Sequence, residues 1–542
     1  MINFARNCEL MVAKRRLPAG VQDFEKLRQE GFVYVDKTQY VYDLANKYGD
    51  AIFLSRPRRF GKSLLCSTLK CYFQGRRDLF KGLAIEQMET DWTVYPVLHF
   101  DMSQAKRVDP AHVRVVLSGK LSDYEALYGV NRAKKTLGDR LEWLVAEAHR
   151  QTGHRTVLIF DEYDSPMLEV IDDSYKMRQM RDIFTEFYGP VKSMAEHLRF
   201  VFLTGITKFS QMSIFSTINH LTNISMNRQF EGVCGITGAE LERDFQPEIL
   251  ALGQENDWSP DETMARLQAQ YDGYRFGPGL TEIYNPFSLL SAFVAGALAD
   301  YWFAPGTPSA LLKVLSHYHF NLDDIEGSEV FDTDFNQPFD NFGTALPILY
   351  QSGYLTIKDY NREDNVYTLG IPNGEVYRGL YSSLLEHYVN SNSVSNSRLL
   401  LAVRRAMRND DIDAALTAVQ SYMAALPHHL SNKTEQDFET ILRLLFDAIG
   451  IEVDTEVQSA VGRCDVVMRT PHHIYVIELK TDTGGTVDDA LAQIDSKNYL
   501  IPFWDDPRAK VKVGVVMDRA TRTVREWKVI DEGAAASQTG KA

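Results

Sequence analysis

The chain has 542 residues and a formal net charge of −15 at pH 7, with 44% hydrophobic and 24% charged residues. This length predicts several domains, and this composition is that of an ordinary globular protein. The acidic balance argues against a surface coated with basic side chains for indiscriminate nucleic-acid binding, although it is compatible with a local basic groove.

Neither a membrane-spanning helix nor a secretory signal is expected. No run of about 18 apolar residues exists, and the N-terminal stretch has no long apolar core. The sequence has five scattered cysteines and no Cys-x-x-Cys pair. They predict free buried thiols in a reducing compartment and argue against a metal–thiolate site. We therefore expect a cytoplasmic protein without a membrane partner.

After a flexible lead-in at residues 1–16, apolar runs alternate with amphipathic stretches over residues 17–240. Continuous apolar strands that alternate with helices predict a parallel sheet covered on both faces. The predicted strands are Ala51–Ser55, Val97–Asp101, Thr156–Glu162 and Arg199–Gly205.

After about Gly238, helical periodicity with turn-rich interruptions replaces this pattern. Between Tyr350 and Ile371 a helix precedes a hairpin, which either contacts DNA as a winged helix or acts as a spacer. A new unit then starts with an N-cap signal at Ser431 or Thr434. The predicted boundaries are 241–320 for a helical lid, 321–430 for a helical and winged-helix-like connector, 431–530 for a C-terminal domain and 531–542 for a disordered tail.

The stretch "FLSRPRRFGKSLLCSTL" combines a strand, a loop ending in Gly-Lys-Ser and the start of a helix. In a phosphate-binding loop of this kind, backbone amides hold the phosphates, Lys62 reaches the β and γ oxygens, and the Ser63 hydroxyl binds Mg²⁺. The usual first glycine is replaced by Arg56, so the loop must turn by another route. Arg56, Arg58 and Arg59 are expected to add positive charge beside the site.

Two further strands end in polar residues that suit nucleotide hydrolysis. In "VLIFDEYD", Asp161 suits a Mg²⁺ ligand and Glu162 suits the base that activates the attacking water. Thr204 ends another strand, where a polar side chain can sense the γ-phosphate. The alternative is that these strands simply end in charged turns. The residues predicted to bind the nucleotide are Arg59, Gly61, Lys62, Ser63, Leu64, Asp161 and Thr204.

A predicted hairpin over residues 462–480 carries three charges. Side chains two apart on a strand share a face, so Glu478 and Lys480 point the same way, and the turn brings Asp465 alongside them. Two carboxylates and the Leu479 carbonyl can bind Mg²⁺ or Mn²⁺, and Lys480 can orient a water for attack on a phosphodiester. The alternative is a surface hairpin with a Glu/Lys pair. The apolar run before these charges favours the metal site, because burying charge without a task is costly. The predicted metal ligands are Asp465 and Glu478 here, and Ser63 and Asp161 at the phosphate loop.

Helices on either side of this hairpin offer further groups. Gln493 and Lys497 share one face of a predicted helix, so Gln493 can lean toward the metal site in a catalytic role and Lys497 toward a phosphate. Glu435 or Glu439 on the preceding helix can supply another carboxylate. Each of these side chains could equally be solvated.

The hairpin resembles the PD-(D/E)XK nuclease superfamily, through Glu456, Asp465, Glu478, Lys480 and Gln493. The front half resembles the AAA-ATPase-like proteins that precede such a nuclease domain in many bacterial chains. The stretches that carry this resemblance include "LPAGVQDFEKLR", "YVDKT", "RPRRFGKS", "DEYD", "TGITKFS", "YDGYRF", "YNPFS" and "LYQSGYLTI".

Over residues 17–528 the resemblance implies an α/β chain. It comprises a P-loop parallel-sheet ATPase domain, a helical and winged-helix-like middle, and a C-terminal α/β restriction-endonuclease-like domain. It implies ATP and Mg²⁺ as cofactors, with Mn²⁺ as an alternative at the nuclease site, and nucleic acid, by preference DNA, as the partner. No arginine finger can be assigned. Arg228 is a candidate by position alone, and without a finger in the same chain hydrolysis would need a homo-oligomer.

Three functions compete on this sequence. The leading hypothesis is an ATPase that gates metal-dependent cleavage of nucleic acid. The second is a nucleotide-dependent switch or binding module with an inactive nuclease domain. The third, a small-molecule phosphotransferase, ranks last because it leaves the nuclease-like hairpin without a role.

Overall fold

The computed structural model describes residues 15–532 except 106–108, 172, 208–220, 303–324, 336–344, 390–392, 425–434, 450, 460–461, 519 and 521–522. The chain divides into two compact units, residues 1–375 and 376–542. The predicted connector at residues 321–430 therefore spans the boundary between them.

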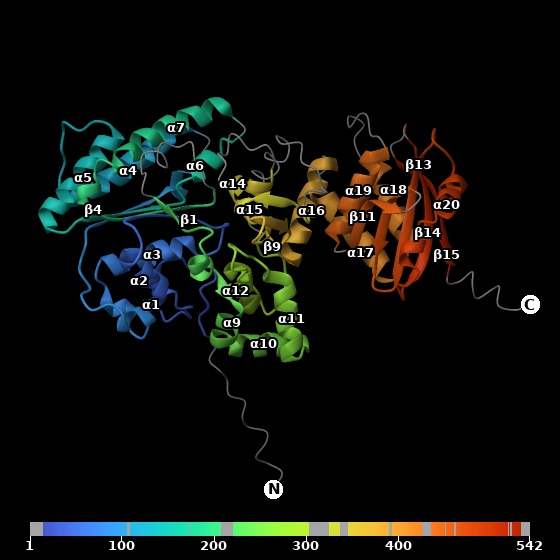
Figure 1. Cartoon of the computed structure of the whole chain (residues 1–542), viewed down its shortest axis with the longest axis horizontal. Coiled ribbons are helices and arrows are strands. Elements are labelled where there is room, and N and C mark those ends of the chain that lie inside the picture. The colour runs from blue at the N-terminus through green and yellow to red at the C-terminus, as the bar shows by residue number, and fades with distance from the viewer. Residues whose placement is uncertain are drawn as a thin grey trace, which may run out of the picture. The chain divides into compact units, whose positions relative to one another are not determined.

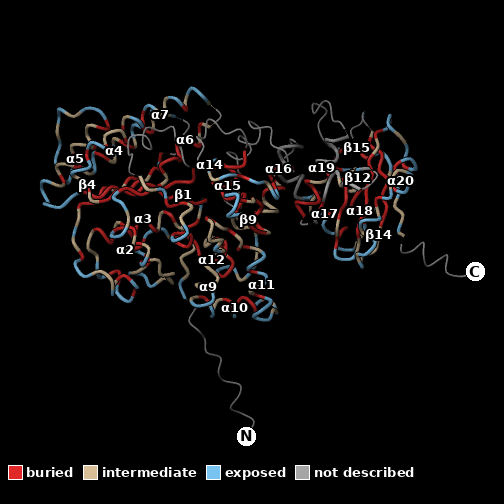
Figure 2. Tube along the Cα trace, viewed as in Figure 1, coloured by how far each residue is buried: buried red, intermediate tan, exposed pale blue. Residues whose placement is uncertain are grey.

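The first unit contains the predicted parallel sheet, with strand order β2-β3-β4-β1-β5 (Figure 1). Its strands pair in parallel, and those of the centre are almost wholly buried, as Figure 2 shows in red for β1 and β4. The prediction of a covered parallel sheet is confirmed. The strands are β1 (Ala51–Ser55), β2 (Val97–Asp101), β3 (Thr156–Asp161), β4 (Leu198–Gly205) and β5 (Thr222–Asn223).

Helices cover both faces of this sheet, with α1 to α3 on one side and α4, α5 and α7 on the other (Figure 1). Their starts follow the usual capping chemistry: the Asp109 side chain caps α4, with proline in its first turn, and the Thr136 side chain caps α5. The helices are α1 (Phe24–Gln29), α2 (Thr38–Asn46), α3 (Lys62–Phe73), α4 (Pro110–Tyr128), α5 (Leu137–Thr152), α6 (Ser165–Leu168) and α7 (Ser174–Tyr188).

A helical segment follows, where the sequence predicts a lid. Its helices share an apolar core that includes Leu241, Phe245, Leu267 and Phe293. A Thr237–Glu240 capping box starts the first helix. The elements are β6 (Ile236–Thr237), α9 (Gly238–Asp244), α10 (Gln246–Asn256), α11 (Pro260–Tyr271), β7 (Ile283–Tyr284) and α12 (Pro286–Ala295).

The predicted helix and hairpin at residues 350–371 are present. Helix α15 precedes the antiparallel pair β9/β10, and β8 pairs with the other edge of β10. The elements are β8 (Glu329–Phe331), α14 (Asp332–Phe335), α15 (Leu346–Ser352), β9 (Thr356–Asn361), β10 (Val366–Gly370) and α16 (Gly374–Val389), which crosses the boundary between the units.

The second unit is built on a five-stranded sheet of order β11-β12-β13-β14-β15. Strands β11 to β13 form an antiparallel meander, β14 joins β13 in parallel, and β15 closes the edge antiparallel. Helix α20 connects the parallel pair, as a parallel connection requires. The strands are β11 (Glu452–Ser459), β12 (Gly462–Arg469), β13 (His473–Thr481), β14 (Ala509–Asp518) and β15 (Thr523–Asp531).

Four helices accompany this sheet. Leu442, Leu445 and Phe446 of α19 are buried at the spacing of one helix face. Helix α18 is tied to β15, because Gln420 donates to the Val524 carbonyl at 2.7 Å. The helices are α17 (Ser393–Arg408), α18 (Ile412–Ala424), α19 (Glu435–Ala448) and α20 (Val487–Ser496).

Some of the predictions concern residues at the limits of the described ranges or outside them. Arg15 and Arg16, placed by the sequence in the flexible lead-in, form ion pairs with Glu248 and Glu30. The N-cap candidates Ser431 and Thr434 lie outside the described residues. Within the described ranges, none of the helices is long and apolar enough to cross a membrane.

Candidate active sites

The phosphate loop connects β1 to α3 through two backbone turns. Arg59 has φ 69° and Gly61, the N-cap of α3, has φ 94°. Glycine meets this conformation without the strain that a Cβ brings, so Gly61 is the residue the turn requires. The Lys62 amine is buried and donates to the carbonyls of Arg56 and Pro57, each at 2.9 Å.

Arg56, which stands where a glycine is usual, has a structural task. It is 2% exposed, and its guanidinium donates to the carbonyls of Ser55, Ser225 and Phe230 at 2.7–2.9 Å. The guanidinium also lies 4.3 Å from the centre of the Phe276 ring, a cation–π contact. The side chain thus fastens the loop to distant segments from behind. The sequence predicted positive charge at this position and did not predict this anchoring role.

The side chain of Arg59 also turns away from the loop. Its guanidinium lies 4.0 Å from the centre of the Phe287 ring on α12 and donates to the Tyr301 carbonyl at 3.2 Å. If Arg59 binds the nucleotide as predicted, it does so through its backbone and not through its side chain. Arg58 is exposed.

Ser63 and Asp161 meet at the mouth of the loop. The Ser63 side chain hydrogen-bonds to the Asp161 carboxylate, whose Oδ1 is buried without a hydrogen-bond partner. Burial raises the pKa of Asp161 to about 6. A hydroxyl beside a carboxylate with a free buried oxygen fits Mg²⁺, which takes oxygen ligands. Glu162 follows with φ 49°, close enough to Lys62 for their charges to interact.

The end of β4 is less open to a nucleotide than the sequence suggests. The Thr204 hydroxyl is fully buried and donates to the Leu54 carbonyl at 2.8 Å. Sequence reasoning gave no role to Asp164, whose carboxylate accepts from both the amide and the hydroxyl of Thr207 and from the Ile206 amide. A Cβ on Gly205 would lie 2.4 Å from Asp164 Oδ1, so this carboxylate explains the glycine.

An apolar cavity adjoins the loop and contains about 610 Å³ of space that no atom fills, part of it open to solvent. Phe60, Gly61 and Leu64 of the loop region form one wall. Val33 to Val35 and Leu290 of α12 are among the residues that complete it. The predicted contact residue Leu64 therefore faces a space that can hold a flat apolar group.

Segments between residues 274 and 353 of the first unit pack against the same loop. A Cβ on Gly353 would lie 2.7 Å from Pro57 Cβ. The Tyr274 ring centre lies 4.7 Å from that of Phe60, and Trp302 Nε1 donates to the Arg58 carbonyl at 3.3 Å. The family stretches "YDGYRF" and "YQSGY" thus support the phosphate loop directly.

In the second unit the hairpin brings together the three predicted charges. Lys480 Nζ lies 2.9 Å from Glu478 Oε1, and the Leu479 amide donates to Asp465 Oδ2 at 2.7 Å. The Asp465 amide donates in turn to the Glu478 carboxylate. The antiparallel register Val466↔Ile477 produces this meeting, because it sets the end of β13 beside the start of β12.

The burial and the raised pKa of Glu478 are typical of a residue in a functional site. Its side chain is 1% exposed, and its Oε2 is buried without a hydrogen-bond partner. Burial and the neighbouring charge of Asp465 raise the pKa of Glu478, and Lys480 opposes this rise. Two close carboxylates with one free buried oxygen fit a divalent cation, which would stabilise both negative charges.

Sequence comparisons match a known family over each of the two regions. Residues 18–215 match the family described as "Predicted AAA-ATPase", and residues 433–527 match the PD-(D/E)XK nuclease superfamily. An Azotobacter chroococcum mcd 1 protein, described as an "Uncharacterized protein in vnfD 5'region", is 30% identical over 524 residues. The match covers 95% of this chain and 98% of that protein. The chain belongs to this family of AAA-ATPase-like proteins with a C-terminal PD-(D/E)XK domain.

Among solved structures, the ORC2 protein of Aeropyrum pernix, in ADPNP and ADP complexes, aligns with 62% of this chain and 87% of its own. The identity is 12% and the TM-score 0.25. A score this low adds nothing to the assignment of the fold.

Tyr499 joins the nuclease-like site, although sequence reasoning gave it no role. Its hydroxyl donates to the Arg463 carbonyl at 2.7 Å and lies 3.5 Å from Gln493 Nε2. The charges of Glu478 and Asp465 act on it. Gln493 is therefore held at the edge of the site through Tyr499.

The remaining predicted residues are less closely placed. Lys497 is the C-cap of α20, and Arg228 is exposed at the start of the 3₁₀ helix Arg228–Val233. Glu435 and Glu439 lie on α19 and Glu456 on β11, with side chains outside the described residues.

Proposed function

We propose that this protein binds and hydrolyses ATP in its first unit and that this activity controls metal-dependent cleavage of nucleic acid, DNA by preference, in its second unit. The observation that carries the proposal is the hairpin constellation. Asp465, Glu478 and Lys480 lie within contact of one another, and one buried carboxylate oxygen has no partner. A bound cation would satisfy this oxygen and balance the charge of the two neighbouring carboxylates.

At the nuclease site, Asp465 and Glu478 would hold the cation. When bound, Mg²⁺ or Mn²⁺ supplies Lewis-acid polarisation of the phosphodiester and neutralises the charge that develops on it. Lys480, paired with Glu478, positions the attacking water and donates toward the non-bridging oxygen. Gln493, held by Tyr499, orients that water from the side of α20.

At the phosphate loop, Ser63 and Asp161 would hold Mg²⁺, and Lys62 would exchange its loop carbonyls for phosphate oxygens. The phosphate loop leads into the N-terminus of α3, where the first backbone amides of a helix favour anions. Glu162 is the base in this proposal, and Thr204 is a sensor only if its bond to Leu54 breaks. In this proposal, the adenine ring of ATP binds in the apolar cavity beside Phe60.

The test is cleavage of plasmid and linear DNA, and of RNA, with Mg²⁺ or Mn²⁺, with and without ATP. Asp465→Ala and Lys480→Ala should each lower cleavage by at least about 100-fold. Lys62→Ala should remove the effect of ATP. Lys528→Ala is the matched control, because this exposed lysine of the same sheet pairs only with Asp488 among the described residues. If the wild type cuts neither DNA nor RNA, the proposal is wrong.

A second candidate is a nucleotide-dependent switch without fast turnover. It is favoured by the Thr204 hydroxyl, which already bonds inside the sheet, and by Arg228, which is exposed and, among the described residues, has no hydrogen bond or ion pair with the nucleotide site. A finger supplied by a second copy of the chain would reconcile hydrolysis with this geometry. ATP turnover that rises with protein concentration would support such a homo-oligomer.

We also place the protein in a reducing compartment, the cytoplasm. Four cysteines, Cys66, Cys71, Cys234 and Cys464, are free and buried. Free thiols of this kind persist where glutathione and thioredoxin keep them reduced.

A further inference from the structure

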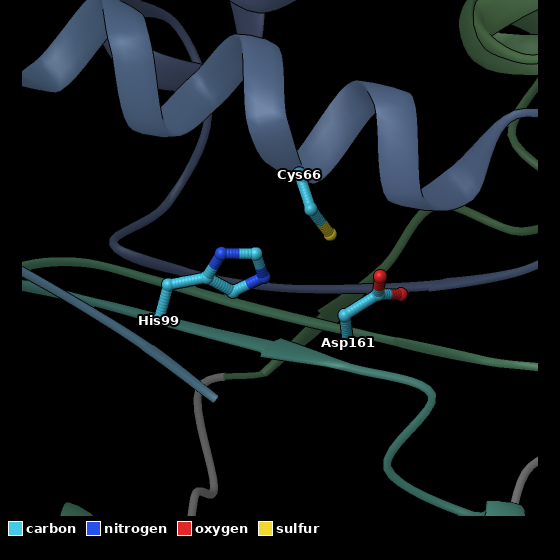
Figure 3. Close-up of side chains that lie close together, drawn as sticks. All are labelled: Cys66, His99 and Asp161. Carbon is cyan, nitrogen blue, oxygen red and sulfur yellow. The ribbon is translucent and has the colours of Figure 1, made fainter. Parts of the chain in front are cut away.

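Three potential metal ligands meet between α3 and the parallel sheet. One ligand atom each from Cys66, His99 and Asp161 lies within 4.8 Å of the others. Figure 3 shows the thiol pointing from α3 toward the sheet, and the imidazole and carboxylate directed to the same space from β2 and β3. Within the described ranges, no other group of three such residues is this close.

Two atoms of this group lack partners. His99 Nε2 and Asp161 Oδ1 are both buried without a hydrogen bond. Asp161 is 2% exposed and Cys66 is 0% exposed. A bound cation would satisfy both of these atoms together with the thiol.

The donor set selects a class of ion. Sulfur, imidazole nitrogen and one carboxylate oxygen are the ligands of Zn²⁺ and of the late first-row metals, whereas Mg²⁺ takes oxygen alone. Tetrahedral bonds of about 2.0–2.3 Å require the donors to move inward by roughly 1 Å.

A fourth position has a candidate on the same sheet edge. Asp101 ends β2 and pairs in register with Asp161. Asp101 lies two residues after His99 on β2, so the two side chains share one face of the strand. Asp101 or a water would complete four-coordination.

We propose that Cys66, His99 and Asp161 bind a zinc-class divalent cation, and that this ion keeps the nucleotide site inactive by occupying the free Asp161 oxygen that Mg²⁺ requires. Binding forms three bonds to the ion and releases the Cys66 thiol proton to solvent, without a change in oxidation state. The inhibitory part rests on the proposed ATP hydrolysis, whereas the binding part does not.

The first test is titration of the metal-free full-length protein with Co²⁺. The wild type should develop the thiolate-to-cobalt charge-transfer band. Cys66→Ser should abolish this band, and His99→Gln should weaken Co²⁺ binding by about tenfold or more. Cys71→Ser is the matched control, since Cys71 is a buried thiol of the same helix outside the group.

Two results would overturn the binding site: a wild type without the thiolate band, or a band that survives Cys66→Ser. Far-ultraviolet circular dichroism checks that the variants fold. His99→Gln keeps the test decisive if Cys66→Ser does not fold. Asp465→Ala should keep the band, which separates this site from the cation site of the hairpin.

The second test is ATP hydrolysis in Mg²⁺ with one equivalent of Zn²⁺ and then with a zinc chelator. Zn²⁺ should slow the wild type and Cys71→Ser at least about tenfold, reversibly, whereas the ratio of rates in Cys66→Ser should stay near one. A cobalt band together with zinc-insensitive hydrolysis overturns the inhibitory part alone. A wild type that hydrolyses no ATP under any condition overturns the proposed function and the inhibitory part, and the cobalt band then decides the site by itself.

Discussion

The phosphate loop and the nuclease-like hairpin both set a lysine near buried carboxylates, but they are built in different ways. At the hairpin, Lys480 pairs directly with Glu478, and neighbouring backbone amides lock Asp465 into place. At the loop, Lys62 is bonded to carbonyls of its own loop, and the loop is fastened from behind by Arg56. One site is complete within two adjacent strands, and the other depends on segments far along the chain.

This contrast predicts different consequences of mutation. Changes at the hairpin should act first on chemistry, because the three charged side chains come from two adjacent strands. Changes behind the loop should act first on stability and only then on nucleotide binding. The four predictions below test this separation, from the largest expected effect to the smallest.

Arg56→Met should destabilise the first unit by about 3–5 kcal/mol, because it leaves the buried carbonyls of Ser225 and Phe230 without donors. Faster amide hydrogen exchange in β1 and α3 of the full-length variant measures the loss. Arg58→Met, an exposed neighbour in the same loop, should stay within about 0.5 kcal/mol of the wild type. Equal exchange in both variants would show that the loop does not depend on Arg56.

Gly353→Ala should lower ATP affinity by about tenfold, because its Cβ would push against Pro57 of the phosphate loop. Its control is Gly327→Ala. Both glycines have positive φ, 88° and 79°, but a Cβ on Gly327 meets nothing within 4 Å. Backbone strain is thus common to both variants, and only the push on the loop differs. Titration with a fluorescent ATP analogue measures the effect, and equal affinities would rule out the mechanical link.

Asp272→Asn tests a buried carboxylate outside both sites. Burial raises the pKa of Asp272 to about 6, and Glu282 adds to the rise. The folded protein therefore holds this proton more tightly than the unfolded chain, and the wild type loses stability as pH rises through about 4 to 6. The stability of Asp272→Asn relative to wild type should grow by about 1.4 kcal/mol between about pH 5 and pH 7.5.

Urea unfolding at the two pH values measures this difference. Asp261→Asn, an exposed carboxylate on α11, should show no comparable growth. A flat difference for Asp272→Asn would mean that burial alone does not raise carboxyl pKa values in this protein, and that the two sites differ from the rest of the interior.

Tyr499→Phe should lower nuclease activity by about three- to tenfold and leave stability nearly unchanged, because it frees Gln493 without touching the carboxylates. Tyr475→Phe is the control, since Tyr475 lies on the same sheet and its hydroxyl donates to the Asp410 carbonyl in the connection between α17 and α18. Cleavage rates at saturating DNA compare the two. An equal loss of cleavage rate in both variants would mean that Tyr499 only packs in the domain and does not position Gln493.

The hairpin site could be predicted because its information is local. Alternation and a short turn fix which side chains meet, and the structure brings Asp465, Glu478 and Lys480 together as the sequence predicts. The apolar runs of the sequence also predicted the parallel sheet. Strand β15 was missed because Arg525, Glu526 and Lys528 are exposed and interrupt the apolar pattern, as charges do on many edge strands.

Groups that depend on distant partners could not be predicted. Nothing near Arg56 in the sequence shows that its guanidinium points inward to Ser225 and Phe230. The group of Cys66, His99 and Asp161 comes from three separate elements, so it has no spacing signature, and cysteine spacing even argued against a thiolate site. Only the register of β2 with β3 and the position of α3 bring these ligands together.

The inward arginine also limits redesign by consensus. A designer who compares this loop with the common phosphate-loop pattern would replace Arg56 by glycine to repair it. That substitution would delete a buried guanidinium, three hydrogen bonds and a cation–π contact for a backbone freedom that Arg59 and Gly61 already provide. In this chain, Arg56 departs from the common sequence motif but stabilises the loop, and replacing it by the motif's glycine would destabilise the protein.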